Sequence, residues 1–342
     1  MKGYQFEDTQ GTFHLKKAEN ISYLYFPIAG EAGLKSSLTP NLGGDAKIDQ
    51  NTFLLEPVSA ENLVNNRNSR NFWCNVKGIG SWSLTGNAAE ALSKKFTEMQ
   101  DDSEVTAGFM WQKTTRESKK YQLRGEILSF IPVEKNVEVM LVTITNTGRM
   151  AQTVTPTAAI PLYGRSADNI RDHRHVTSLL HRIETTDTGV LVTPTLSFDE
   201  RGHQVNHMTY YCVGWSGNGE KPVDFYPTAE DFVGEGGNFE RPYAIVKNAE
   251  GVKAGTRIEG LEAVGGLHFS EVTLEPEEEC SYLIFTGITE DIQEIRNLSK
   301  TYTTREMVLE ELEKTKAYWQ EVQKKIFARE IQKKMWQLSW EA

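Results

Sequence analysis

Residues Val137 to Thr145 read VEVMLVTIT, a run dominated by β-branched side chains. Lys135-Asn136 precedes the run, and Asn146-Thr147-Gly148 follows it. Because β-branched residues favour extended backbone while Asn and Gly favour turns, the run predicts a buried strand with a turn at each end.

Similar runs recur between about residues 11 and 290. Gly189 to Phe198 and Met208 to Trp215 flank the turn residues 199–202, which predicts a hairpin. Ser281 to Thr289, SYLIFTGIT, predicts a further strand. No segment in this region keeps a helical period for more than about three turns, as an alternating α/β fold would require. The predicted fold class is therefore mainly β, a large two-sheet antiparallel β-sandwich followed by C-terminal linker helices.

The pattern changes after about residue 290. Residues 303–306 fit a capping box, with Thr303 as the N-cap and Glu306 three positions later. Apolar residues then recur at the spacing of one helix face: Val308, Leu312, Trp319, Val322 and Ile326. We expect a β-sandwich domain over residues 1–290 and a helical linker over residues 291–342.

Composition excludes several classes of function. The chain has 37 basic and 47 acidic side chains and a net charge of -10, so a nucleic acid would be repelled. Its three cysteines, Cys74, Cys212 and Cys280, form no CxxC pair and predict neither a disulfide framework nor a zinc knuckle. Met1 to Gln10 lack the apolar core of a signal peptide, and no apolar run is long enough to span a membrane. We expect a cytoplasmic protein.

The most unusual stretch runs from Gly164 to His175, GRSADNIRDHRH. Its ionisable side chains are Arg165, Asp168, Arg171, Asp172, His173, Arg174 and His175. Guanidinium groups bind phosphate, carboxylate or sugar hydroxyls through paired donors, and aspartates accept from sugar hydroxyls. The alternative is an ion-paired loop that holds a turn or a subunit contact, and the residues alone favour that alternative. His173 and His175 could share one strand face, but no third ligand is evident nearby, so we expect no metal site.

A second polar stretch runs from Asn62 to Trp73, NLVNNRNSRNFW. Its amides and aromatic pair could bind a sugar, but an Asn-rich connection leading into a core strand over 71–76 is slightly favoured. Trp82 is likewise expected to be a core residue. No phosphate loop, GxSxG or HExxH motif is present, and no spacing identifies a catalytic pair of carboxylates.

The segment Pro161 to Leu180, PLYGRSADNIRDHRHVTSLL, resembles the corresponding stretch of 1,2-β-oligoglucan phosphorylases. These enzymes group with cellobiose and chitobiose phosphorylases. Asn68 to Trp73 and Gly80 to Gly86 are similar to the N-terminal region of the same family. The resemblance extends over the chain up to the helices after residue 290.

The resemblance implies an N-terminal β-sandwich, helical linkers, an (α/α)6 catalytic barrel and a small C-terminal β domain. Members of the family cleave a β-glucosidic bond with inorganic phosphate as co-substrate, without a cofactor, and invert the anomeric centre. Their one catalytic acid is an aspartate of the barrel. No residue of this chain is therefore assigned as catalytic, and we expect the chain alone to be inactive.

The resemblance also implies partners: a β-glucan oligosaccharide, a barrel in cis or on a separate chain, and a second copy in a homodimer. Loops of the sandwich reach toward the partner's active site, and the stretch Arg165 to His175 would carry that substrate-binding role. Its side chains should then lie at the surface. Two other hypotheses remain: a stand-alone carbohydrate-binding or regulatory sandwich without catalysis, and, least favoured, a small enzyme that uses Asp168 or Asp172 as its acid.

Overall fold

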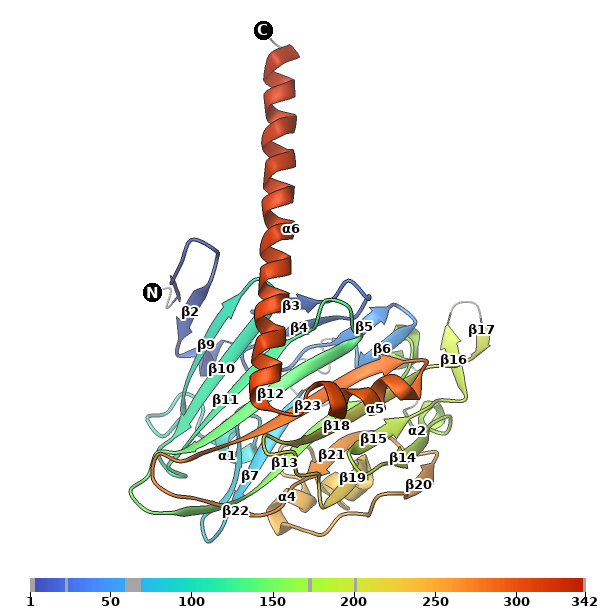
Figure 1. Cartoon of the computed structure of the whole chain (residues 1–342). Coiled ribbons are helices and arrows are strands. Elements are labelled where there is room, and N and C mark those ends of the chain that lie inside the picture. Colours follow the sequence, from blue (N-terminus) through green and yellow to red (C-terminus); the bar gives the residue numbers. More distant parts are fainter. Residues whose placement is uncertain (1–3, 22–23, 59–68, 172–173, 200–201, 341–342) are drawn as a thin grey trace.

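The computed structural model describes residues 4–21, 24–58, 69–171, 174–199 and 202–340; at 4, 170–171, 174–175, 199 and 327–340 it describes the backbone only. Two large antiparallel sheets pack face to face, and a long helix rises from them (Figure 1). The predicted fold class, a mainly β antiparallel sandwich followed by helices, is confirmed.

The larger sheet has 11 strands within the described residues. In spatial order they are β1 (Tyr4–Phe6), β2 (Phe13–Lys16), β9 (Asp102–Gly108), β10 (Trp111–Ser118), β11 (Leu123–Phe130), β12 (Val137–Asn146), β23 (Glu279–Thr289), β18 (Thr209–Ser216), β15 (Gly189–Val192), β14 (Arg182–Thr185) and β20 (Arg257–Glu259). The run that predicted a buried strand is β12, at the centre of this sheet, and all its residues are buried. Its neighbour β23 contains the second predicted strand, over 281–289.

The smaller sheet packs against the inner face of the larger one. Its strands are β19 (Asp224–Thr228), β21 (Ala263–His268), β13 (Gln152–Leu162), β7 (Asn71–Val76) and β8 (Gly80–Ser83), and β22 (Val272–Leu274) also pairs with β13. The inner faces form the main core, in which the rings of Phe72 and Tyr282 lie 5.5 Å apart between centroids.

The predicted hairpin is present with an insertion. Strand β15 pairs antiparallel with β18, so that Val190 lies opposite Cys212. Between them, β16 (Leu196–Asp199) and β17 (Gly202–Val205) form a second hairpin, which projects beyond the sandwich (Figure 1). All side chains of β17 are exposed. A separate four-stranded sheet comprises β3 (Phe26–Ala29), β4 (Lys35–Leu38), β5 (Ala46–Asp49) and β6 (Thr52–Leu55).

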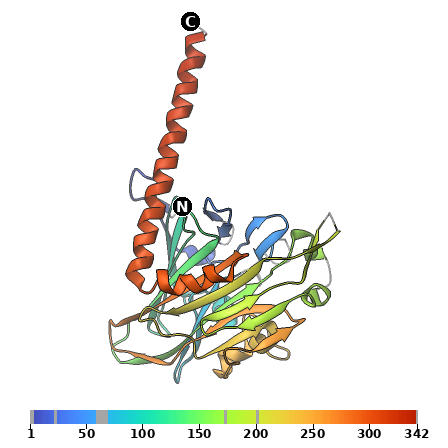
Figure 2. The same ribbon diagram turned by 45° about the vertical axis from the view of Figure 1, so that its right-hand side comes forward.

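Helices cover the outer face of the larger sheet. The last strand ends at Thr289, and α5 (Ile292–Thr301) and α6 (Arg305–Trp340) follow. Figure 2 shows α5 lying across the sheet and α6 turning away from it. Ile295 and Leu298 of α5 pack with outward-facing residues of the sheet. Helices therefore bury the outer face while the second sheet buries the inner face, which explains why β12 is continuously apolar and does not alternate.

Helix α6 departs from its predicted form at both ends. It begins at Arg305, one residue later than the capping box predicts, and the hydroxyl of Thr303 instead lies 3.2 Å from Sδ of Met307. Trp319 is the last buried residue of the predicted apolar face, whereas Ile326 is 54% exposed. Among the described side chains of the helix, burial against the sandwich thus extends only as far as Trp319. Neither α6 nor any other described helix has the length and apolar character needed to cross a bilayer.

Candidate functional site

The stretch that begins at Gly164 starts inside the molecule, where β13 leaves the smaller sheet. Gly164 has φ +61°, and a Cβ at this position would lie 3.3 Å from the ring of Tyr210. Its backbone N–H donates to the carbonyl of Phe53, and the Phe53 N–H donates to the carbonyl of Arg165 at 2.9 Å. These bonds tie the start of the stretch to strand β6. A short 3-10 helix (η2, Ala167–Arg171) and α2 (Arg174–Ser178) follow.

Arg165 is buried, with only 5% of its surface exposed. Its Cζ lies 5.2 Å from the ring centroid of Tyr163, and it lines a cavity of about 10 Å³ together with Glu56 and Glu262. Such a cavity holds at most about one water, so this cavity does not admit a sugar ring. The expectation that this side chain lies at the surface was wrong. Glu56 and Glu262 line the same cavity, and the ring of Tyr163 lies beside the guanidinium, so the surroundings can offset the cost of burying this charge.

Polar contacts hold the turn after Arg165 to two other segments. The hydroxyl of Ser166 contacts the carbonyl of Phe198 on β16 and lies 3.2 Å from Oδ1 of Asn169. The N–H of Ala167 donates to the carbonyl of Gln50 at 2.9 Å. The base of the stretch is therefore a rigid, buried structure and not a free surface loop.

His181 lies beside this base and is fully buried. Its Nδ1–H donates to the carbonyl of Leu261 at 3.2 Å. Burial, and next the positive charge of Arg165, lower the pKa of His181 to about 3. The imidazole is therefore neutral near pH 7, and it forms one buried cluster with Arg165.

The other predicted site residues do not join this cluster among the described side chains. Asp168 is exposed on η2. The backbone of Arg171 ends η2, and that of Arg174 and His175 begins α2, but their side chains lie outside the description. Asp172 and His173 lie wholly outside the described residues. No group of three or more potential metal ligands occurs among the side chains that are described.

The second polar stretch belongs to the core where it is described. Residues 69–73 are buried, and the side chains of Phe72 and Trp73 are at most 1% exposed. This confirms the favoured interpretation of a connection leading into a core strand; residues 62–68 lie outside the description. Trp82 is also buried, as predicted, and its Nε1–H donates to Oδ2 of Asp101 at 2.8 Å.

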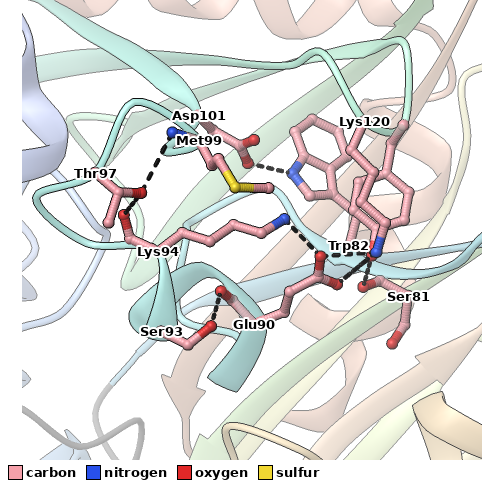
Figure 3. A network of polar contacts seen from close by, with 10 residues as sticks. Ser81, Trp82, Glu90, Ser93, Lys94, Thr97, Met99, Asp101 and Lys120 are labelled. Carbon is pink, nitrogen blue, oxygen red and sulfur yellow. Dashed lines mark hydrogen bonds and ion pairs between the residues drawn. The ribbon is translucent and has the colours of Figure 1, made fainter.

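A third polar cluster, which the sequence did not predict, surrounds Glu90 of α1 (Ala89–Ser93) (Figure 3). The Glu90 carboxylate accepts from Nζ of Lys94 at 2.6 Å, Nζ of Lys120 at 2.7 Å and Oη of Tyr121 at 2.7 Å. Burial would raise the pKa of Glu90, but these hydrogen bonds outweigh it and lower the pKa to about 2. The sequence gives one indication of a polar cluster here: the inward-facing positions of strand β10 are polar and include Gln112, Thr114 and Arg116.

The family model of the glycosyl hydrolase 94 supersandwich domain matches residues 57–305, from before β7 to the first residue of α6. The chain belongs to this family. The match includes β7, into which the second polar stretch leads, and β13, which precedes the stretch that begins at Gly164. No curated protein matches the chain.

Several solved structures have a similar fold to this supersandwich domain. A protein described as a kojibiose phosphorylase from the human microbiome is 9% identical, with a TM-score of 0.45, over 93% of this chain and 38% of that chain. A bacterial glucoamylase complexed with acarbose is 10% identical, with a TM-score of 0.40, over 91% and 37% of the two chains. A protein of Escherichia coli K12 described as an aldose 1-epimerase is 9% identical, with a TM-score of 0.41, over 78% and 99%. The chain thus spans 38% and 37% of the first two proteins.

Proposed function

We propose that the chain is the N-terminal, non-catalytic module of an inverting β-glucan phosphorylase that acts on β-1,2-linked oligoglucans. The observation that carries this proposal is the family match over residues 57–305. The resemblance of residues 161–180 to 1,2-β-oligoglucan phosphorylases supports the narrower substrate class.

The chemistry explains why such a module needs no catalytic residue of its own. Inverting cleavage by phosphate requires one acid, which protonates the leaving glycosidic oxygen. Phosphate is already anionic, so no general base is needed to activate it. The acid would come from an (α/α)6 barrel, in cis or on a separate chain. The module would act in the cytoplasm, as part of a homodimer, on a β-glucan oligosaccharide.

Within this proposal the polar stretch divides into two parts. Arg165 is a positioning residue, because it is buried beneath the turn that leads to η2. The residues beyond it, from Asp168 to His175, would contact substrate in the partner's active site. The exposed position of Asp168 is compatible with that role.

The first test is activity. The 342-residue chain, incubated with β-1,2-gluco-oligosaccharides and inorganic phosphate, should release no glucose 1-phosphate, and adding a matching barrel protein should restore release. Steady phosphorolysis by the chain alone, abolished by Asp172→Asn or Asp168→Asn, would place the acid in this chain. Glucan binding that no barrel converts into turnover would favour the stand-alone carbohydrate-binding protein.

The second test concerns Arg171 and Arg174. In an enzyme that contains the barrel, Arg171→Ala or Arg174→Ala should reduce kcat/KM by about tenfold or more, because a hydrogen bond to a charged group contributes about 1.5–3 kcal/mol. This proposal requires both side chains to lie at the surface, where charges contribute little stability, so Tm should change little. Arg149→Ala, an exposed arginine between β12 and β13, is the matched control. A large fall in Tm with normal kinetics would instead assign both arginines to a structural ion-pair network.

A further inference from the structure

A small pocket lies at the edge of the sandwich, where α1 and the segment after it cover the inner face of β10. Its volume is about 30 Å³, and its lining includes Arg116, Lys94, Lys95, Asn41, Asp101 and Glu90. The pocket is separate from the stretch that begins at Gly164, and nothing in the proposed function uses it.

The guanidinium of Arg116 is held at this pocket by close packing. Arg116 is 5% exposed and points inward from β10. A Cβ on Gly86 would lie 2.5 Å from Cζ of Arg116, and Gly86 has φ +76°, so this position requires glycine both for space and for backbone conformation. The charge is therefore fixed in place below the surface.

Arg116 has few partners for a buried arginine. Its Nη2 donates to Oδ1 of Asn41 at 3.3 Å and to the carbonyl of Thr85 at 3.4 Å, both longer than ordinary hydrogen bonds. No carboxylate of the described residues lies within 4.0 Å of it. By contrast, the buried Arg70 donates to both oxygens of Glu138 at 2.6 and 3.0 Å. A buried charge without a counter-charge in contact with it is costly. Arg116 therefore lacks the neutralising partner that Arg70 has in Glu138.

The carboxylates around the pocket are occupied by other donors. Glu90 is held by Lys94 and Lys120, and Asp101 accepts from Trp82, as Figure 3 shows. Glu19 accepts from the N–H and the hydroxyl of Ser103, each at 3.2 Å. None of the three contacts the guanidinium, and Asp101 and Glu19 act on its charge only through space.

We propose that the Arg116 pocket binds a small oxyanion, a phosphate group, either free or carried by a small metabolite. Guanidinium presents paired donors that match phosphate oxygens, and Lys95 adds a second positive charge to the lining. A water needs about 10–15 Å³ of such space, so 30 Å³ admits a group of only a few atoms, and the ring of a sugar phosphate would remain outside the pocket.

The test uses the full chain, with calorimetric titration and thermal unfolding at constant ionic strength. Inorganic phosphate should raise Tm by a few degrees, and Arg116→Met should weaken binding at least tenfold and abolish the rise. Lys113→Met, on the same strand but pointing outward, is the matched control and should bind normally. Glucose 1-phosphate distinguishes the sources: binding of both ligands indicates that a monoester is accepted, whereas binding of phosphate alone indicates a free ion.

Ligand-free stability gives a second readout. Arg116→Met should be at least as stable as the wild type without phosphate, because it removes a buried charge that no carboxylate contacts. The proposal is wrong if phosphate has no effect, if acetate acts as strongly as phosphate, or if Arg116→Met keeps the full response. It is also wrong if Arg116→Met is destabilised and phosphate shifts neither protein. Should Arg116→Met not fold, Arg116→Lys retains the charge without the paired donors and should bind phosphate several-fold more weakly.

Discussion

Arg70→Met should destabilise the chain by about 3–5 kcal/mol, because it leaves the buried carboxylate of Glu138 without its counter-charge. Arg70 and Glu138 have side chains that are 1% and 3% exposed. Nε and Nη2 of Arg70 donate to the two carboxylate oxygens, and the hydroxyl of Ser36 donates to Oε2 at 2.6 Å. With Arg70 removed, Ser36 is the one donor to that carboxylate that remains among these contacts.

Chemical denaturation of two single variants and one double variant measures this effect. Arg70→Met and Glu138→Leu should each be strongly destabilised, and the double variant should recover much of the loss, since replacing both ions with apolar groups removes the unpaired charge. The control is Lys113→Met, which breaks an exposed pair with Glu126 and should cost at most about 1 kcal/mol. Single variants that lose less than the control would show that the pair contributes nothing net.

The same ion pair gives the described end of the polar stretch before β7, residues 69–73, a structural role. Nη1 of Arg70 also donates to the carbonyl of Gly44 at 2.6 Å. One side chain therefore links the four-stranded sheet, through Ser36 and the loop at Gly44, to the central strand β12. The amides and the aromatic pair of this stretch allowed a sugar-binding alternative, whereas the partners of Arg70, which make it structural, lie 26 and 68 residues away in the sequence.

The strands were predictable from sequence because their signal is local. The β-branched run of β12 and its flanking turns specify a buried strand without knowledge of any neighbour. The charged residues were not predictable in this way. Arg165 is buried in a part of the fold where it lines one cavity with Glu56 and Glu262, and Arg116 is buried where Gly86 leaves room for its guanidinium. Its composition made the stretch around Arg165 a candidate binding site. Composition alone could not distinguish the buried Arg165 from the residues that follow it.

His181 should make the chain sensitive to acid well above the range in which most carboxylates protonate. Its pKa is about 3 in the folded chain, against an ordinary value of 6.5 when unfolded. Below pH 6.5 the unfolded chain takes up a proton that the folded chain does not, so stability is full above pH 6.5 and falls as the pH decreases toward 3. At 1.36 kcal/mol per unit, the loss between pH 7.5 and pH 5 is about 2 kcal/mol.

Removing the imidazole should flatten this dependence. In denaturation curves at pH 7.5 and pH 5, His181→Asn should lose about 2 kcal/mol less than the wild type, whereas His203→Gln, on the exposed strand β17, should lose as much as the wild type. Arg165→Met should raise the pKa of His181, measured by NMR, because the nearby positive charge opposes protonation. Equal losses in the wild type and His181→Asn would mean that His181 does not remain neutral in the fold, and the buried cluster with Arg165 would then have to admit a second positive charge.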